Sequence, residues 1–225
     1  MGGGKFEDNH SCYFDGSSDQ INLGSSIAYN VHNANYSFSF WFKRYSYGWD
    51  RIVSKASVGT NQFILLGDET NKAKIQLECD TDQKRIRTDQ HEGLLNKWYH
   101  MVITTDGSGG GAFYQNGKFI ALETGGGSSN DMDAAMTIDT IGNVNNGWIN
   151  DLAVYDIDIG TAGAAHLYNS GEPYNHSEGK YASDLINWWR MGDGIGDIST
   201  TIKDQEGTVD GTIAADVSIT GDVPW

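Results

Sequence analysis

Acidic residues near position 80 are the first group whose types and spacing could do chemistry. Glu78, Asp80 and Asp82 follow an alternating, strand-like run and lead into a polar turn. A retaining glycosidase needs two carboxyl groups about 5 Å apart, one as acid and base and one as nucleophile. A strand that runs into an acidic turn accounts for the same residues, and no Ser/His/Asp or Cys/His arrangement is legible elsewhere. We therefore expect that the protein is not an enzyme and has no catalytic residues. Its expected role is to bind a ligand or to form an assembly.

Two polar loops that contain aromatic residues form the second candidate site. One loop supplies Tyr47 and Trp49, and the other supplies Asn146 and Trp148. A flat ring can stack on the apolar face of a sugar while nearby Asn and Asp side chains hold its hydroxyl groups. These four residues are the predicted carbohydrate-binding residues. Packing in the core or at a subunit contact is the alternative role for such rings.

Oxygen ligands for a metal ion lie in one further loop. Asp131 and Asp133 are separated by a single residue in a polar stretch before a predicted strand. Hard cations such as Ca²⁺ prefer carboxylate oxygens, and Asp15 and Asp19 could add ligands. The pattern favours Ca²⁺ as the candidate cofactor at Asp131 and Asp133, with a solvated acidic loop as the alternative.

The elements that must position these residues are strands. Apolar and polar residues alternate from Tyr36 to Phe42, which places Phe38 and Phe40 on the face opposite Trp41. The 29 glycines and only 2 prolines suit many short strands joined by glycine-rich turns. These patterns predict an all-β fold in which antiparallel strands follow one another along the chain.

Two local signals are more specific. Asn116 and Gly117 stand between two apolar runs and predict a tight hairpin, because a type I′ turn needs positive φ at both positions. Residues 161–169 form the one expected helical segment, with Gly171 as its terminator.

Charge, hydropathy and cysteine usage exclude several classes of protein. Fifteen basic and thirty acidic residues give a formal charge of −15, which would repel a nucleic-acid backbone. No apolar run approaches the roughly 20 residues of a membrane span, and no export signal follows Met1. Cys12 and Cys79 are too few for a disulfide framework, so we expect free thiols, although a bridge between them stays open.

The order of motifs resembles the laminin G-like branch of the concanavalin A-like lectin/glucanase superfamily. The similar segments, all between residues 11 and 171, are Cys12–Gly24, Ser37–Lys43, Trp98–Val102, Tyr114–Lys118, Gly147–Tyr155 and Leu167–Asn169. The resemblance implies an antiparallel, two-sheet jelly-roll sandwich that holds sugars, often beside Ca²⁺. Glucanases of this superfamily carry an E-x-D-x-x-E strand, but here Gln83 stands in place of the second glutamate. Glycoside hydrolysis is therefore the less favoured alternative.

The C-terminal part of the chain differs in sequence pattern from the rest and carries a second resemblance. Residues 185–194, 202–205 and 210–212 are similar to segments that follow laminin G-like domains in structural proteins of marine tailed phages. We therefore expect a sandwich over residues 1–180 and a tryptophan-containing appendage over 181–225, docked on a sandwich of its own or a neighbouring subunit. Trp188 and Trp189 carry too much apolar surface to stay in water.

Together these patterns predict a non-enzymatic component of a phage virion, in a tail or capsid appendage. Its expected partners are other virion proteins, further copies of itself in a trimer or dimer, and a cell-surface glycan. It would be made in the host cytoplasm and located in the virion. A cellular carbohydrate-binding or adhesion module is the alternative, and purely architectural packing is a third reading.

Overall fold

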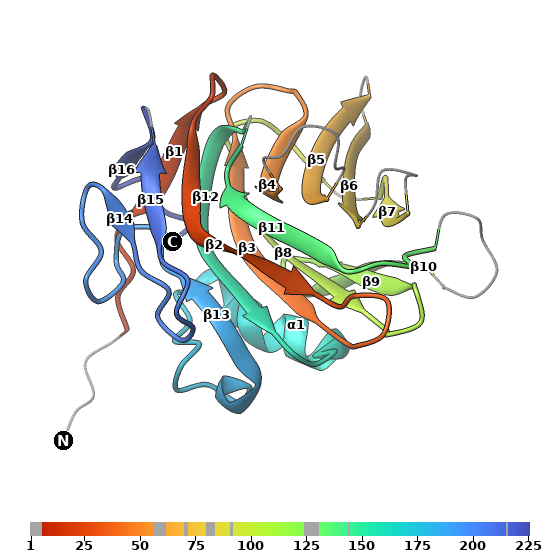
Figure 1. Cartoon of the computed structure of the whole chain (residues 1–225). Helices are drawn as coiled ribbons and strands as arrows, with labels where there is room; N and C mark the ends of the chain where they lie inside the picture. The colour runs from red at the N-terminus through yellow and green to blue at the C-terminus, as the bar shows by residue number, and fades with distance from the viewer. Residues whose placement is uncertain are drawn as a thin grey trace.

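The chain folds into two antiparallel β-sheets that lie face to face (Figure 1). The structure, a computed structural model, describes residues 6–55, 62–69, 72–79, 84–90, 92–123, 131–143, 145–214 and 216–225. Strands dominate throughout these ranges, and each sheet has eight. The predicted all-β sandwich is therefore confirmed.

The first sheet contains strands from both ends of the chain. Its strands in spatial order are β10 (Lys118–Glu123), β9 (Gly111–Gln115), β8 (Trp98–Thr105), β3 (Ser37–Arg44), β12 (Asn146–Tyr155), β1 (Ser11–Asp15) and β16 (Ser218–Thr220). A further strand, β13 (Leu185–Trp189), also pairs with β12.

The second sheet packs against the first. Its strands in spatial order are β14 (Thr201–Ile202), β15 (Gly211–Ala214), β2 (Gln20–Tyr29), β11 (Met136–Ile141), β4 (Asp50–Ser54), β5 (Phe63–Glu69), β6 (Lys72–Glu78) and β7 (Arg85–Thr88). Several connections cross from one sheet to the other, including the one from β3 to β4.

The alternation in β3 decides which side chains enter the core. Phe38, Phe40 and Phe42 belong to the cluster between the sheets and are at most 1% exposed. Ser39 and Trp41 point to the other side of the first sheet, as the period of two requires. The predicted faces of this strand are therefore confirmed.

The outer side of the first sheet carries its own apolar cluster beneath α1 (Gly160–Tyr168). Ala164 and Leu167 of the helix are buried there with Val102 and Tyr114 from the sheet. The expected helix is confirmed, but its terminator is not Gly171. Asn169 ends the helix in the left-handed region, with φ 47°, and its backbone N–H bonds to the carbonyl of His166.

The hairpin and the cysteines follow the sequence. Asn116 and Gly117 have φ of 50° and 73°, and they connect β9 to β10. Cys12 and Cys79 are both buried thiols that are not joined in a disulfide. Among the described residues, no helix is long and apolar enough to cross a membrane.

The segment 181–225 contributes strands to both sheets. β13 pairs with β12, β16 with β1, and β15 with β2. Trp188 and Trp189 are 3% and 0% exposed, so their own chain covers them. Trp189 lies in the core between the sheets, where its indole N–H donates to the carbonyl of Val209 at 2.9 Å.

We predict that Trp189→Ala lowers the free energy of unfolding by about 3 to 5 kcal/mol, because the substitution leaves a cavity in the core between the two sheets. Urea unfolding measures this loss. Ile195→Ala is the control, since Ile195 is 88% exposed and its truncation should stay within about 0.5 kcal/mol of wild type. Equal stability of the two variants would show that the C-terminal segment does not contribute to the core.

Candidate functional site

Exposed aromatic side chains gather where β3, β4 and β12 meet. Tyr45, Tyr47 and Trp49 lie in the short connection between β3 and β4 and are 56%, 52% and 54% exposed. Trp148 of β12 and Tyr13 of β1 stand beside this connection. We call these five residues the aromatic rim.

A buried ion pair holds the β3–β4 connection in shape. Arg44 is 1% exposed, and its Nε donates to Asp50 Oδ2 at 2.6 Å. Its Nη2 donates to the carbonyl of Gly48 at 2.8 Å, so the guanidinium spans the loop that it closes. The same guanidinium lies 5.4 Å from the centre of the Tyr47 ring. The exposed rings therefore stand on a rigid support.

Asn146 joins this connection to the start of β12. Its backbone N–H donates to Asp50 Oδ1 at 3.0 Å, and its side-chain Nδ2 donates to Ser46 Oγ at 2.8 Å. Its carbonyl accepts the N–H of Tyr45 at 2.9 Å. The two loops that the sequence singles out are therefore neighbours, although Asn146 and Trp148 belong to a strand rather than to a loop.

Trp148 is half-buried because three side chains pack on it. The ring of Tyr13 lies 4.7 Å away, centre to centre, and the ring of Tyr45 lies 6.4 Å away. Lys43 Nζ stands 4.5 Å from the ring centre on the neighbouring strand. Tyr13 was not among the predicted residues, because its position depends on the long-range pairing of Tyr13 with Trp148.

Trp49 rests on β5 at a glycine. A Cβ atom at Gly67 would lie 2.6 Å from Cζ3 of Trp49, so only glycine lets the indole lie this close to the strand. Trp49 is thus fixed on one side and open to solvent on the other.

Carboxylates gather at Asp15 and Asp19, which the sequence suggested only as additional ligands. Among the described residues, the group of at least three that could hold a metal ion is Asp15, Asp19 and Asp216. Asp19 is buried, and it accepts the backbone N–H of Asp15 at 2.6 Å and of Asp216 at 3.3 Å. Burial raises the pKa of Asp19, and these backbone hydrogen bonds oppose the shift.

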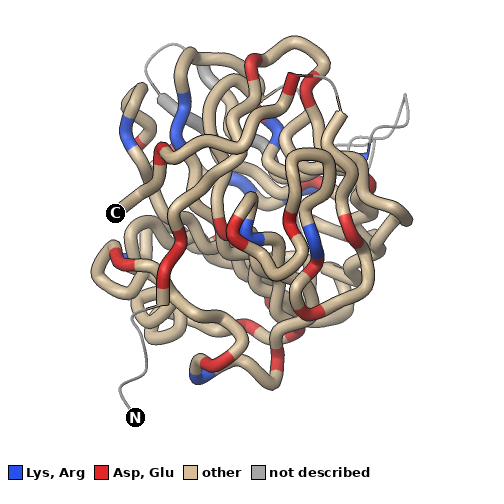
Figure 2. The backbone as a smooth tube through the Cα atoms, turned by 90° about the vertical axis from the view of Figure 1, so that its left-hand side faces the viewer, with Lys and Arg blue, Asp and Glu red and all other residues tan. Residues whose placement is uncertain are grey.

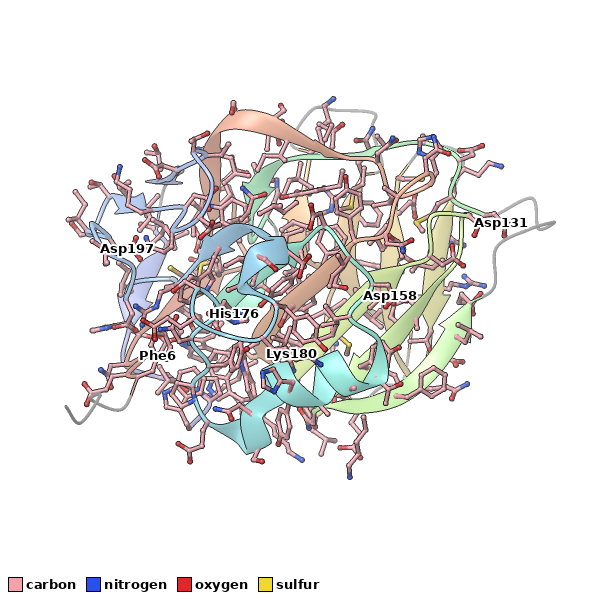
Figure 3. All side chains as sticks on the ribbon, turned by 90° about the horizontal axis from the view of Figure 1, so that it is seen from below. Phe6, Asp131, Asp158, His176, Lys180 and Asp197 are labelled. Atoms are coloured by element: carbon pink, nitrogen blue, oxygen red, sulfur yellow. The ribbon has the colours of Figure 1, made fainter. Side chains whose placement is uncertain are left out.

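Asp131 and Asp133 do not belong to that group. Asp133 forms an ion pair with Lys84 at 3.3 Å, and Asp131 lies at the opposite end of the molecule from Asp197 (Figure 3). Calcium binding at Asp131 and Asp133 stays a prediction.

The acidic strand end near position 80 is only partly described. Glu78 is 2% exposed, accepts a hydrogen bond from Gln76 at 3.1 Å and pairs with Arg85 at 3.5 Å. Asp80 and Asp82, like Gln83, lie outside the described residues. The described partners of Glu78 are those of a structural carboxylate.

A second polar cluster is closed to solvent. Asp151 accepts hydrogen bonds from Trp188 Nε1 at 2.6 Å and from His176 Nε2 at 2.9 Å, and His176 Nδ1 contacts the Tyr155 hydroxyl. Burial alone would raise the pKa of Asp151, but His176 and the indole N–H outweigh it and lower the pKa. His176 comes from the loop that crosses the outer side of the first sheet (Figure 3), so this cluster fastens that loop.

Acidic residues are spread along the backbone rather than gathered in one patch (Figure 2). The formal charge of −15 therefore acts over a broad surface.

The family of the chain can now be stated. Residues 15–163 match the family model of the concanavalin A-like lectin/glucanases superfamily named Laminin_G_3, which covers more than half of the chain. The chain belongs to this family. No curated protein matches it.

Solved structures share the fold at low identity. A protein from Bacteroides ovatus for which carbohydrate binding has been proposed has a TM-score of 0.64 at 16% identity, over 96% of this chain and 60% of that one. The heptameric SAP-like pentraxin of Limulus polyphemus has a TM-score of 0.57 at 16% identity, over 92% and 96%. The receptor-binding domain of botulinum neurotoxin D has a TM-score of 0.52 at 20% identity, over 72% and 43%. The chain thus spans less than two thirds of the first and third proteins.

We predict that Arg44→Ala destabilises the fold by about 3 to 5 kcal/mol, because it leaves Asp50 buried without its counter-ion. Urea unfolding measures the loss, and the double variant Arg44→Met, Asp50→Leu is the comparison. Removing both charges should cost less than removing Arg44 alone. A double variant that is less stable than Arg44→Ala would contradict this account of the pair.

Proposed function

We propose that the aromatic rim binds carbohydrate and that the protein is a non-enzymatic, lectin-like module. The observation that carries the proposal is the exposure of Tyr45, Tyr47 and Trp49, each more than half open to solvent on one short loop. Large rings are normally buried, so three exposed rings together indicate a binding surface.

The support beneath the rings favours binding. The buried pair of Arg44 and Asp50 fixes the loop before any ligand arrives, and a preorganised surface loses less entropy on binding. Asn146 Nδ2 holds the hydroxyl of the half-buried Ser46 beside the rings, where Ser46 can meet sugar hydroxyl groups. The name of the Bacteroides ovatus protein, which shares the fold, is consistent with this proposal.

Charge indicates which glycans the rim would accept. Asp15 stands directly opposite Asn146 in the ladder between β1 and β12, so the group of Asp15, Asp19 and Asp216 borders the rim. These carboxylates and the overall charge of −15 disfavour sialylated or sulfated glycans. Neutral glycans are the proposed ligand class.

We expect Trp49→Ala to weaken binding of a neutral glycan by about tenfold or more, because the exposed indole supplies the stacking surface. A glycan array first identifies the ligand, and isothermal titration then compares the variants. Leu94→Ala is the control, since Leu94 is a 59% exposed apolar residue on another loop.

Gly67→Val gives a second test that changes none of the aromatic residues themselves. A side chain at Gly67 must displace Trp49, so binding should fall while the overall fold remains. A glycan array on which the protein binds nothing, or unchanged glycan binding by Trp49→Ala and Gly67→Val, would contradict the proposal that the aromatic rim is the binding site. Release of reducing sugar by the wild-type protein would contradict the non-enzymatic part.

Calcium binding at Asp131 and Asp133 is the companion proposal. With free Ca²⁺ at about 100 times its dissociation constant, the free energy of unfolding should rise by about 2.7 kcal/mol. The melting temperature with Ca²⁺ and with a chelator measures the change, which Asp131→Asn should abolish and Asp15→Asn should not. The reverse pattern would move the ion to the group of Asp15, Asp19 and Asp216.

A virion is the proposed setting for this module. The similarity of residues 185–194, 202–205 and 210–212 to segments of marine tailed-phage structural proteins supports a place in a tail or capsid appendage, among other virion proteins. Detecting the protein in purified particles tests this, and finding it on the surface of uninfected cells would favour the cellular adhesion module instead.

A further inference from the structure

The strand at one end of the first sheet has an unusual exposed side. β10 pairs with β9, and no other described strand pairs with its outer edge (Figure 1). Phe119 and Leu122 of β10 are 51% and 60% exposed. An end strand with exposed apolar residues is a template for pairing with another chain.

A β-bulge places both apolar side chains on the same face. Residues three apart on a regular strand point to opposite faces, but the register with β9 shifts between Phe119 and Ala121. Phe119 pairs with Tyr114 and Leu122 pairs with Ala112. Both of these β9 residues belong to the cluster on the outer side of the sheet.

The charged residues at the ends of β10 share the other face. Lys118 pairs with Gln115 and Glu123 pairs with Gly111, each one step along β9 from an outward-facing residue. Lys118 and Glu123 are both exposed. In chain order, β10 therefore consists of a cation, an apolar residue, two central residues, an apolar residue and an anion.

This order is complementary to itself when the strand is reversed. We propose that two copies of this chain pair antiparallel through β10 about a twofold axis, which makes the first sheet continuous across a homodimer. Lys118 then stands opposite Glu123 of the second copy, and Phe119 stands opposite Leu122, each pair occurring twice. A slip by one residue would set inward side chains against outward ones, so the bulge selects this register.

The other end strands lack this combination. β7 carries Arg85 and Arg87, so two copies of it would repel each other. β14 and β16 have two and three residues, too few for a long ladder. Among the described exposed apolar residues, Phe119 and Leu122 are the ones that lie on an end strand.

Sedimentation equilibrium of the full chain tests the proposal. The wild-type protein should have twice the 24.6 kDa mass of one chain. Lys118→Glu and Glu123→Lys should each raise the dimer dissociation constant by about 100-fold or more, because each sets like charges opposite each other twice. Phe119→Ser should have an effect in the same direction, and Ile195→Ser, on an 88% exposed residue outside β10, should have none.

Mixing the two charge variants provides the decisive measurement. Lys118→Glu presents two acidic ends and Glu123→Lys presents two basic ends, so an equal mixture should form a heterodimer as stable as the wild-type dimer. The double variant Lys118→Glu, Glu123→Lys should dimerise with itself. A wild-type protein that stays monomeric, a dimer that survives both single charge reversals, or a mixture that does not recombine would each overturn the proposal. Glycan binding by isolated monomers is measured separately, so failure here leaves the aromatic rim unaffected.

Discussion

Backbone hydrogen bonding along β12 is the constraint on which most of this fold depends. A strand inside a sheet needs partners on both edges over its whole length. β3 pairs with one edge of β12. On the other edge, Cys12–Asp15 of β1 pair with the first residues of β12, and β13 pairs with its last residues. The N-terminal and C-terminal parts of the chain therefore meet on the same edge of one strand.

Two residues of β12, Asn150 and Asp151, separate these two partners. Asp151 has φ 51° within the bulge between Asn150 and Ala153, next to the first residues of β1 and the last residues of β13. Its carboxylate bonds to Trp188 of β13 and to His176 of the loop that crosses the outer side of the first sheet, so the strained position is held by partners on two other segments. The C-terminal strands thus supply backbone hydrogen bonds that strands of the sandwich need.

Local patterns could be predicted from the sequence, and long-range neighbours could not. The alternation in β3 and the Asn116–Gly117 turn depend on residues close together in the chain, so they were predicted correctly. The bounds of the helix were predicted to within one residue, but its terminator was assigned to Gly171 rather than Asn169, because asparagine adopts the left-handed region less often than glycine. Among the candidate site residues, Tyr47 and Trp49 stand out in a polar loop, but the contacts of Trp148 with Tyr13 and Lys43 follow from strand order, which alternation does not determine.

Some of the acidic residues also have a structural role that the composition does not reveal. Asp204 accepts the backbone N–H of Trp188 and of Gly207, both at 2.9 Å. Asp197 accepts the N–H of Gly192 at 3.0 Å and of Lys203 at 2.6 Å. Carboxylates thus replace ladder partners where the C-terminal loops leave the sheets.

Hydrogen bonding of this kind couples the acidic side chains to the stability of the C-terminal region. Partial burial would raise the pKa of Asp193, but hydrogen bonding, which includes the bonds from His10 and Asn9, outweighs it and lowers the pKa to about 2. A carboxyl whose pKa is lower in the folded chain stabilises the fold above its unfolded value and loses that contribution as the pH falls towards the folded value. Part of the protein's negative charge therefore helps to hold the C-terminal segment on the sandwich.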